Sequence, residues 1–182
     1  MPAKSAAART GPAANVKTKT APTYADLASR MAALHPVLRK KNVTVAAAES
    51  CTGGLLGAIL SEHSGSSGYF RGGMEVYSDA AKTVLADVPP QLIHSHGAVS
   101  AVVAAALARG AREKLGAKIG LGITGIAGPT GATPGKPVGL VYIAVDGPKL
   151  QTVQKRQWSF DRQGNRLASV GVALDLLEQA IG

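Results

Sequence analysis

Residues 43–60 read Val-Thr-Val-Ala-Ala-Ala-Glu-Ser-Cys-Thr-Gly-Gly-Leu-Leu-Gly-Ala-Ile-Leu. The apolar residues at the start of this stretch predict a buried strand, the paired glycines a turn, and the apolar residues after them a helix. This order places Ser50 and Thr52 near the start of a helix, where unpaired backbone N–H groups and the helix dipole favour an anion. Such a place suits a bound phosphate or an activated hydroxyl beside an oxyanion site. The alternative is that Ser50 or Thr52 only caps the helix.

Strand and helix patterns alternate on both sides of this stretch. Helical patterns cover 24–38, 53–62, 79–86, 100–115 and 167–181, and strand patterns cover 43–48, 73–77, 119–123, 138–145 and 152–159. The first helix opens at Thr23 and is followed by Asp26, which is typical of a capping box. Alternating elements that close with a hairpin and a helix predict an α/β fold, a single-domain layered α/β/α sandwich with a mixed sheet.

The charge is unevenly spread along the 182 residues, whose net charge is +9. Residues 1–23 hold four bases and no acid, and the remaining 16 bases and 11 acids leave +5 for residues 24–182. The first segment has few large apolar residues, so we expect a disordered basic tail, with a transit peptide as the alternative. The folded part has no aromatic residues among its basic clusters. This pattern disfavours dedicated nucleic-acid binding and suits a small anionic substrate.

The rare residue types limit the possible chemistry. No apolar run approaches the ~18 residues of a membrane span. The only cysteine, Cys51, excludes an internal disulfide and suits a reducing compartment, so we expect a cytoplasmic protein. His94 and His96 place two rings on one face of a strand-like segment, but no third ligand recurs nearby. We therefore expect neither a metal site nor another cofactor.

Two further segments carry candidate chemistry. The loop 124–137 is rich in glycine, which lets backbone N–H groups approach a ligand, although Thr130 and Pro137 break the Walker pattern. Lys82 follows a strand, and partial burial beside other cations would lower its pKa and make it a base. A serine–lysine pair is a known way to activate serine for acyl transfer. The alternatives are an ordinary hairpin loop and a solvated lysine.

Five motifs in this order resemble the CinA C-terminal domain family over about residues 24–182. They are Ala-Glu-Ser-Cys-Thr-Gly-Gly at 48–54, Gly-Ser-Ser-x-Tyr-Phe-x-Gly-Gly at 65–73, Tyr-Ser-x-x-Ala-Lys at 77–82, His-Gly-Ala-Val-Ser at 96–100, and Thr-Gly-Ile-Ala-Gly-Pro at 124–129, the last followed by Lys-Pro-Val-Gly at 136–139. The resemblance implies a nicotinamide-nucleotide amidohydrolase of pyridine nucleotide salvage, which converts nicotinamide mononucleotide and water to nicotinate mononucleotide and ammonia without a cofactor.

The family pattern also implies residue roles. Ser50, or alternatively Thr52, is the nucleophile, Lys82 is the activating base, and the backbone of residues 51–54 receives the oxyanion. The implied substrate-binding residues are Thr52, Gly53, Gly54, Tyr77, Thr124, Gly125, Ala127 and Arg162. Two departures matter: Asp79 replaces the usual Asn, and one residue is deleted before Arg162, where Ser159 and Phe160 replace Pro-Gly. Arg166 is therefore an alternative phosphate ligand.

The expected partners are a small nucleotide substrate and further copies of the same chain, with no membrane and no dedicated nucleic-acid partner. Two other functions stay open at this point. The same glycine loop would serve a non-catalytic nucleotide-binding module, and the basic tail would suit a DNA-associated accessory protein. Release of ammonia from nicotinamide mononucleotide separates the enzyme from the binding module, and salt-dependent DNA binding that survives deletion of residues 1–23 would support the accessory protein.

Overall fold

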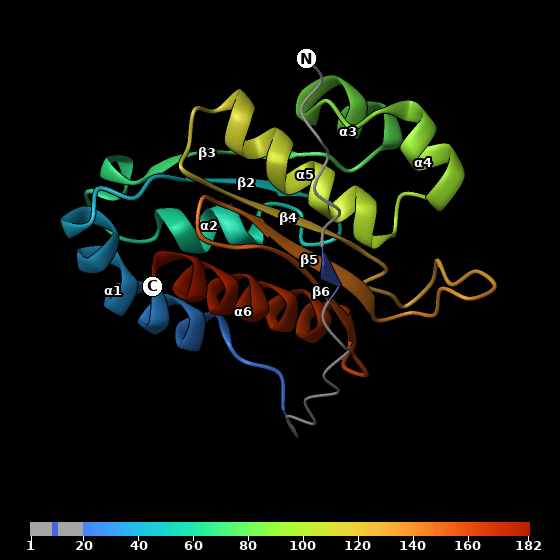
Figure 1. The fold of residues 1–182 in the computed structure, drawn as a ribbon. Coiled ribbons are helices and arrows are strands. Elements are labelled where there is room, and N and C mark those ends of the chain that lie inside the picture. The colour runs from blue at the N-terminus through green and yellow to red at the C-terminus, as the bar shows by residue number, and fades with distance from the viewer. Residues whose placement is uncertain (1–8, 11–19) are drawn as a thin grey trace, which may run out of the picture.

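A mixed sheet lies between two layers of helices in the computed structural model, which describes residues 9–10 and 20–182 (Figure 1). The strands are β1 (Arg9–Thr10), β2 (Val45–Glu49), β3 (Phe70–Glu75), β4 (Ile119–Gly125), β5 (Leu140–Asp146) and β6 (Gln151–Gln157). The helices are α1 (Tyr24–Lys40), α2 (Leu55–Ser61), α3 (Asp79–Ala86), α4 (Pro90–His96), α5 (Ala101–Lys114) and α6 (Arg162–Ile181), with a short 3-10 turn at Ser66–Gly68. This arrangement confirms the predicted α/β sandwich.

The sheet order is β1-β6-β5-β4-β2-β3. Strand β2 runs parallel to both β3 and β4, whereas β5 is antiparallel to both β4 and β6. The parallel half explains why the central strand β2 is buried along its whole length, because helices cover both faces of such sheets. The carboxyl ends of β2, β3 and β4 therefore meet at one edge of the sheet.

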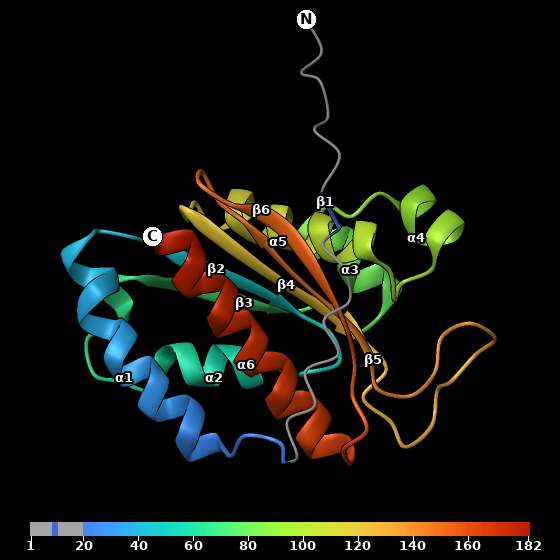
Figure 2. The same cartoon turned by 60° about the horizontal axis from the view of Figure 1, so that its bottom comes forward.

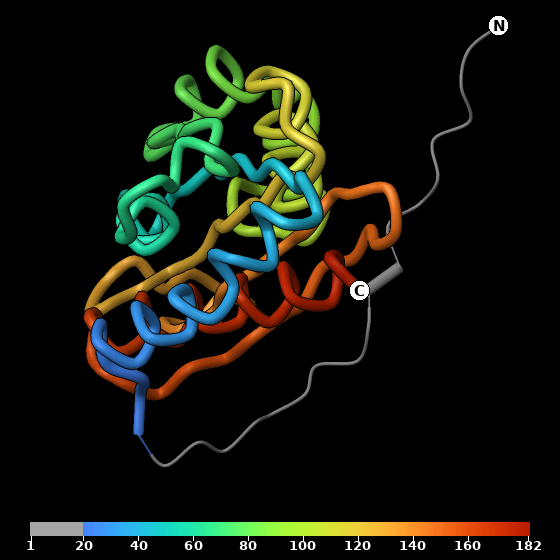
Figure 3. Tube along the Cα trace, turned by 90° about the vertical axis from the view of Figure 1, so that its left-hand side faces the viewer, coloured from blue at the N-terminus to red at the C-terminus, as the bar shows by residue number. Residues whose placement is uncertain are grey.

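Each face of the sheet has its own helical layer. Helices α1, α2 and α6 pack on one face, and α3, α4 and α5 lie on the other (Figure 2). Helices α1 and α6 lie side by side, as the view along the layers also shows (Figure 3). Helix α5 approaches β4 so closely that a Cβ atom at Gly122 would lie 2.5 Å from the Ala104 carbonyl oxygen. Small residues on β4 thus permit this packing.

The element boundaries confirm most of the sequence expectations and correct a few. Thr23 and Asp26 form the predicted capping box of α1. Strand β3 begins at Phe70 rather than at residue 73, because its pairing with β2 already starts there. Helix α2 begins at Leu55, because Gly53 and Gly54 have positive φ angles of 56° and 81°.

One other expectation is wrong. His94 and His96 lie in helix α4, since Pro90 starts a helical turn at a position where its missing N–H costs nothing. Within the segment expected to be a disordered tail, residues 9–10 pair with β6 in parallel. For residues 1–8 and 11–19, the predicted disorder concerns positions outside the described part of the chain. Within the described part, no helix is both long and apolar enough to cross a membrane.

Candidate active site

A cavity of about 330 Å³ lies at the carboxyl ends of β2, β3 and β4. Its wall includes seven residues that the sequence motifs single out: Ser50, Tyr77, Lys82, Thr124, Gly125, Ala127 and Arg162. These residues come from four separate segments: the parallel strands β2, β3 and β4 bring three of them together, and the start of α6 adds Arg162. Open α/β sheets commonly bind their ligands at this edge.

Lys82 is the most deeply buried charged group of this wall. The N-cap of α3, where the Ser78 hydroxyl accepts a hydrogen bond from the Ala81 N–H at 3.1 Å, fixes the turn that carries Lys82. The side chain is only 2% exposed, and its Nζ lies 3.6 Å from an Asp79 carboxylate oxygen. Burial lowers the pKa of Lys82, and the charge of Asp79 opposes this only in part. Lys82 therefore loses its proton more readily than a solvated lysine.

Ser50 follows directly after β2 and continues its pairing, since its N–H donates to the Ile123 carbonyl oxygen at 3.0 Å. The residue is buried and lines the cavity that also contains Lys82. Among the described residues, no hydrogen bond joins the Ser50 hydroxyl to the Lys82 amine. Proton transfer between them thus requires a closer approach or one bridging water.

Cys51 also lines the cavity, and its buried surroundings disfavour the thiolate. Burial raises the pKa of Cys51 to about 12. The thiol therefore stays protonated near neutral pH, and the thiolate is the reactive form. Ser50 is the other residue of this turn with a nucleophilic side chain that lines the cavity.

The start of helix α2 already carries a carboxylate of the protein itself. Glu49 is buried, and its carboxylate accepts hydrogen bonds from the N–H groups of Leu56 at 3.0 Å and Gly57 at 2.8 Å. The N-cap residue is Gly54, which makes no side-chain cap. The interpretation of Ser50 or Thr52 as a cap is therefore wrong, and Glu49 occupies the place where we expected a bound anion.

Thr52, Gly53 and Gly54 do not reach the cavity wall. Thr52 is fully buried, and its hydroxyl has no hydrogen-bond partner in the described part of the chain. Its carbonyl oxygen accepts two hydrogen bonds from Arg166, at 3.1 Å from Nε and 2.6 Å from Nη2. Arg166 and Glu49 thus hold the turn that presents Ser50, one from each side.

Arg162 spans the rim of the cavity. Its guanidinium donates to the Gly128 carbonyl oxygen at 2.7 Å and to the Tyr77 hydroxyl at 3.2 Å. A second cavity of about 680 Å³ shares Ala127 and Arg162 with the first and is also lined by Arg166. Arg162 therefore stands where the two cavities meet.

The glycine loop after β4 is held in place by buried polar contacts. The Thr124 hydroxyl donates to the Ala98 carbonyl oxygen at 2.8 Å. Asn165 donates to the Ala127 carbonyl oxygen at 2.9 Å and accepts from the Phe160 N–H at 3.1 Å. Neither Asn165 nor the anchoring role of Glu49 was expected from the sequence. A carboxylate at the end of an otherwise apolar strand was the available signal for Glu49.

These features define a layered α/β domain whose cavity combines a serine hydroxyl with a desolvated lysine. Residues 27–181 match the family model described as the CinA C-terminal domain, and the chain belongs to this family.

Relatives and solved structures agree with this assignment. The chain is 54% identical over 144 residues to a CinA-like protein of Koribacter versatilis and 49% identical over 144 residues to one of Acidobacterium capsulatum. Each match covers 79% of this chain but 35% of the relative, so the chain spans about a third of the length of these relatives. The crystal structure of the competence/damage inducible protein CihA from Agrobacterium tumefaciens is similar with a TM-score of 0.82 and 32% identity, covering 88% of this chain and 98% of that one. A CinA superfamily protein from Escherichia coli is similar with a TM-score of 0.79 and 31% identity, covering 86% and 90%.

Proposed function

We propose that this domain hydrolyses the carboxamide of nicotinamide mononucleotide to give nicotinate mononucleotide and ammonia. The observation that carries the proposal is one cavity lined by Ser50 and the buried Lys82, with Arg162 at its rim. Amide hydrolysis needs a nucleophile, a group that moves protons and donors for the tetrahedral oxyanion. The cavity offers a candidate for each of these tasks.

The first half of the reaction forms an acyl enzyme. The Ser50 oxygen attacks the carboxamide carbon while the neutral amine of Lys82 accepts the hydroxyl proton. We assign donation to the oxyanion to the N–H of Cys51, the residue that follows the nucleophile. Lys82 then gives its proton to the amide nitrogen, the carbon–nitrogen bond breaks, and ammonia leaves.

The second half of the reaction restores the enzyme. A water molecule attacks the ester carbon, and Lys82 accepts one of its protons. The bond between the carbon and the Ser50 oxygen breaks, and Lys82 returns the proton to that oxygen. Nicotinate mononucleotide then leaves, so one water is consumed for each ammonia released.

The charged end of the substrate fits the second cavity. Arg162 lines both cavities, so its guanidinium can bind a phosphate while the carboxamide lies near Ser50. Both guanidinium groups already donate two hydrogen bonds to protein oxygens, so the choice rests on their positions, and Arg166 lines only the second cavity. We therefore assign the phosphate to Arg162 and a positioning role to Arg166.

The test is to incubate the purified chain with nicotinamide mononucleotide and to quantify both products, nicotinate mononucleotide by chromatography and ammonia by a coupled assay. We expect the two products in equal amounts. Saturable binding of the nucleotide without either product would overturn the proposal and identify a non-catalytic binding module. Release of nicotinamide instead of ammonia would show that a different bond is cleaved.

A further inference from the structure

Arg156 on strand β6 is a buried cation without an ion pair. It is 9% exposed, and no carboxylate of the described residues lies within ion-pair distance. Its guanidinium donates to the Lys155 carbonyl oxygen at 3.1 Å and to the side-chain oxygen of Gln154, but its Nε has no hydrogen-bond partner within the described chain. A buried charge of this kind destabilises the fold unless an acceptor, preferably an anion, completes its surroundings.

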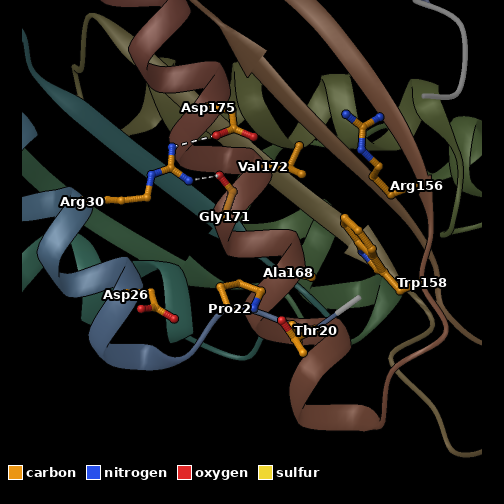
Figure 4. Close-up of a pocket in the computed structure, with 11 residues that line it drawn as sticks. Thr20, Pro22, Asp26, Arg30, Arg156, Trp158, Ala168, Gly171, Val172 and Asp175 are labelled. Atoms are coloured by element: carbon orange, nitrogen blue, oxygen red, sulfur yellow. Dashed lines mark hydrogen bonds and ion pairs between the residues drawn. The ribbon is translucent and has the colours of Figure 1, made fainter. Parts of the chain in front are cut away.

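Arg156 lines a cavity of about 300 Å³ between α6, β6 and the segment that leads into α1 (Figure 4). Trp158 forms part of its wall, with Pro22, Ala168 and Val172 as further apolar contacts. This cavity shares no lining residue with the candidate active site.

The indole of Trp158 is a fixed surface. Its Nε1–H donates to the Ser169 hydroxyl at 3.0 Å, and its ring stacks on Phe160 at a centroid distance of 6.1 Å and an angle of 25°. Because both contacts hold the ring, a flat apolar group can lie against it without ordering a mobile side chain.

The other charged groups of this cavity already have partners. Arg30 is paired with Asp175 at 2.7 Å and with Glu178 at 3.0 Å, as Figure 4 shows for Asp175. The Asp26 carboxylate accepts from the Thr23 N–H at 2.8 Å. Arg156 is therefore the charged group of the lining that lacks an ion pair and an acceptor for its Nε within the described residues. The negative charges of Asp26 and Asp175 also face the cavity.

We propose that this cavity binds a small organic anion, in which a carboxylate or phosphate group meets the Arg156 guanidinium and a flat apolar ring lies against Trp158. The apolar wall selects the ring, and the guanidinium of Arg156, which lines the cavity without an ion pair among the described residues, selects the oxyanion. This proposal does not depend on the amidase activity, because the two cavities are separate.

The chain contains a single tryptophan, so the fluorescence of Trp158 reports on this cavity directly. The titration uses benzoate, with neutral benzamide and ring-free inorganic phosphate as comparison ligands. We expect saturable fluorescence changes that are strongest for benzoate. No saturable change with benzoate, or an equal affinity for benzamide, would overturn the proposal.

Three variants locate the bound benzoate. Arg156→Gln should weaken benzoate binding by about 10-fold or more, because it removes a charged hydrogen bond. Lys155→Gln removes the same charge from the neighbouring exposed position and should bind like the wild type, as should Arg162→Ala. Equal weakening in Lys155→Gln, or weakening in Arg162→Ala instead of Arg156→Gln, would contradict the assignment. Arg156→Lys keeps the positive charge. Its circular dichroism shows whether the chain still folds, and its affinity for benzoate shows whether binding is lost, so the two effects are separated.

Discussion

At the scale of single residues, the proposed chemistry depends on a lysine that can give up its proton. Lys82→Arg should therefore be almost as inactive as Lys82→Ala, because arginine keeps the charge but stays protonated. The measurement is kcat for nicotinamide mononucleotide, with the exposed Lys114→Arg as the control. Retention of most of the activity in Lys82→Arg would show that the lysine acts only through its charge.

The pH profile tests the same residue in another way. Because burial lowers the pKa of Lys82, the neutral amine forms below the ordinary lysine value of 10.5, and kcat/KM should rise with pH through that lowered pKa. Asp79 opposes the lowering. Asp79→Asn should therefore move the rise in activity to lower pH. An unchanged profile, or a shift to higher pH, would contradict this role, and Asp87→Asn, which removes the partner of Lys114, is the control.

The lowered pKa of Lys82 also determines how its contribution to the free energy of unfolding changes with pH. In the pH range between the lowered pKa of folded Lys82 and the ordinary value, the unfolded chain binds the proton that the folded chain has lost. The contribution of Lys82 to the free energy of unfolding thus becomes more favourable as pH rises through this range. At pH values below the lowered pKa, folded Lys82 stays charged, and the burial of this charge lowers the free energy of unfolding.

At the scale of elements, the strand β2, the turn after it and helix α2 act as one unit. Glu49 joins the end of the strand to the first N–H groups of the helix, and Arg166 binds the turn from α6. The hydroxyl of Ser50 is presented by a backbone that is fixed on both sides.

Glu49→Ala should destabilise the protein by about 2–4 kcal/mol, because it leaves the buried N–H groups of Leu56 and Gly57 without an acceptor. The measurement is the free energy of unfolding in urea. Glu62→Ala removes an exposed carboxylate that bonds to Tyr24 and should cost much less. Similar losses in both variants would show that Glu49 has no special role in holding the helix.

At the scale of the whole molecule, the site is made by residues far apart in the sequence. The contact between Arg162 and Tyr77 joins residues 85 positions apart, and Arg166 reaches 114 positions back to Thr52. The alternation of strands and helices predicted the sandwich, and the motifs predicted Ser50, Lys82 and Arg162 as cavity residues. The sequence pattern could not predict which way each side chain points. Thr52 therefore stayed open as an alternative to Ser50, and in the structure only Ser50 of the two lines the cavity.

Two contacts could not be predicted from the sequence, for physical reasons. The pairing of Glu49 with the start of α2 depends on positive φ angles at two glycines, which set where the helix begins. The buried surroundings of Arg156 depend on residues of α6 and of the segment before α1 that line the same cavity, whereas a basic residue in an amphipathic strand is normally solvated. Such tertiary contacts leave no periodic signal in the chain.

The variant Arg162→Ala tests whether one substrate molecule occupies both cavities. Arg162→Ala should lower kcat/KM for nicotinamide mononucleotide by about 10- to 100-fold, the loss expected for a charged hydrogen bond to phosphate. The dephosphorylated nucleoside should be a poor substrate for both proteins and differ little between them. An equal loss on nucleotide and nucleoside would show a structural role through Tyr77 and Gly128, and Arg109→Ala is the exposed control.

The most direct test of the central claim is the turnover of nicotinamide mononucleotide by Ser50→Ala beside Thr52→Val, with the exposed Ser29→Ala as the control. Ser50→Ala should lose several orders of magnitude in kcat while keeping its fold, because it lacks the covalent nucleophile. Thr52→Val should stay close to the wild type, because the Thr52 hydroxyl is buried and unpaired in the described chain. Turnover near the wild-type level in Ser50→Ala, together with an inactive Thr52→Val, would contradict the assignment of Ser50 as the nucleophile.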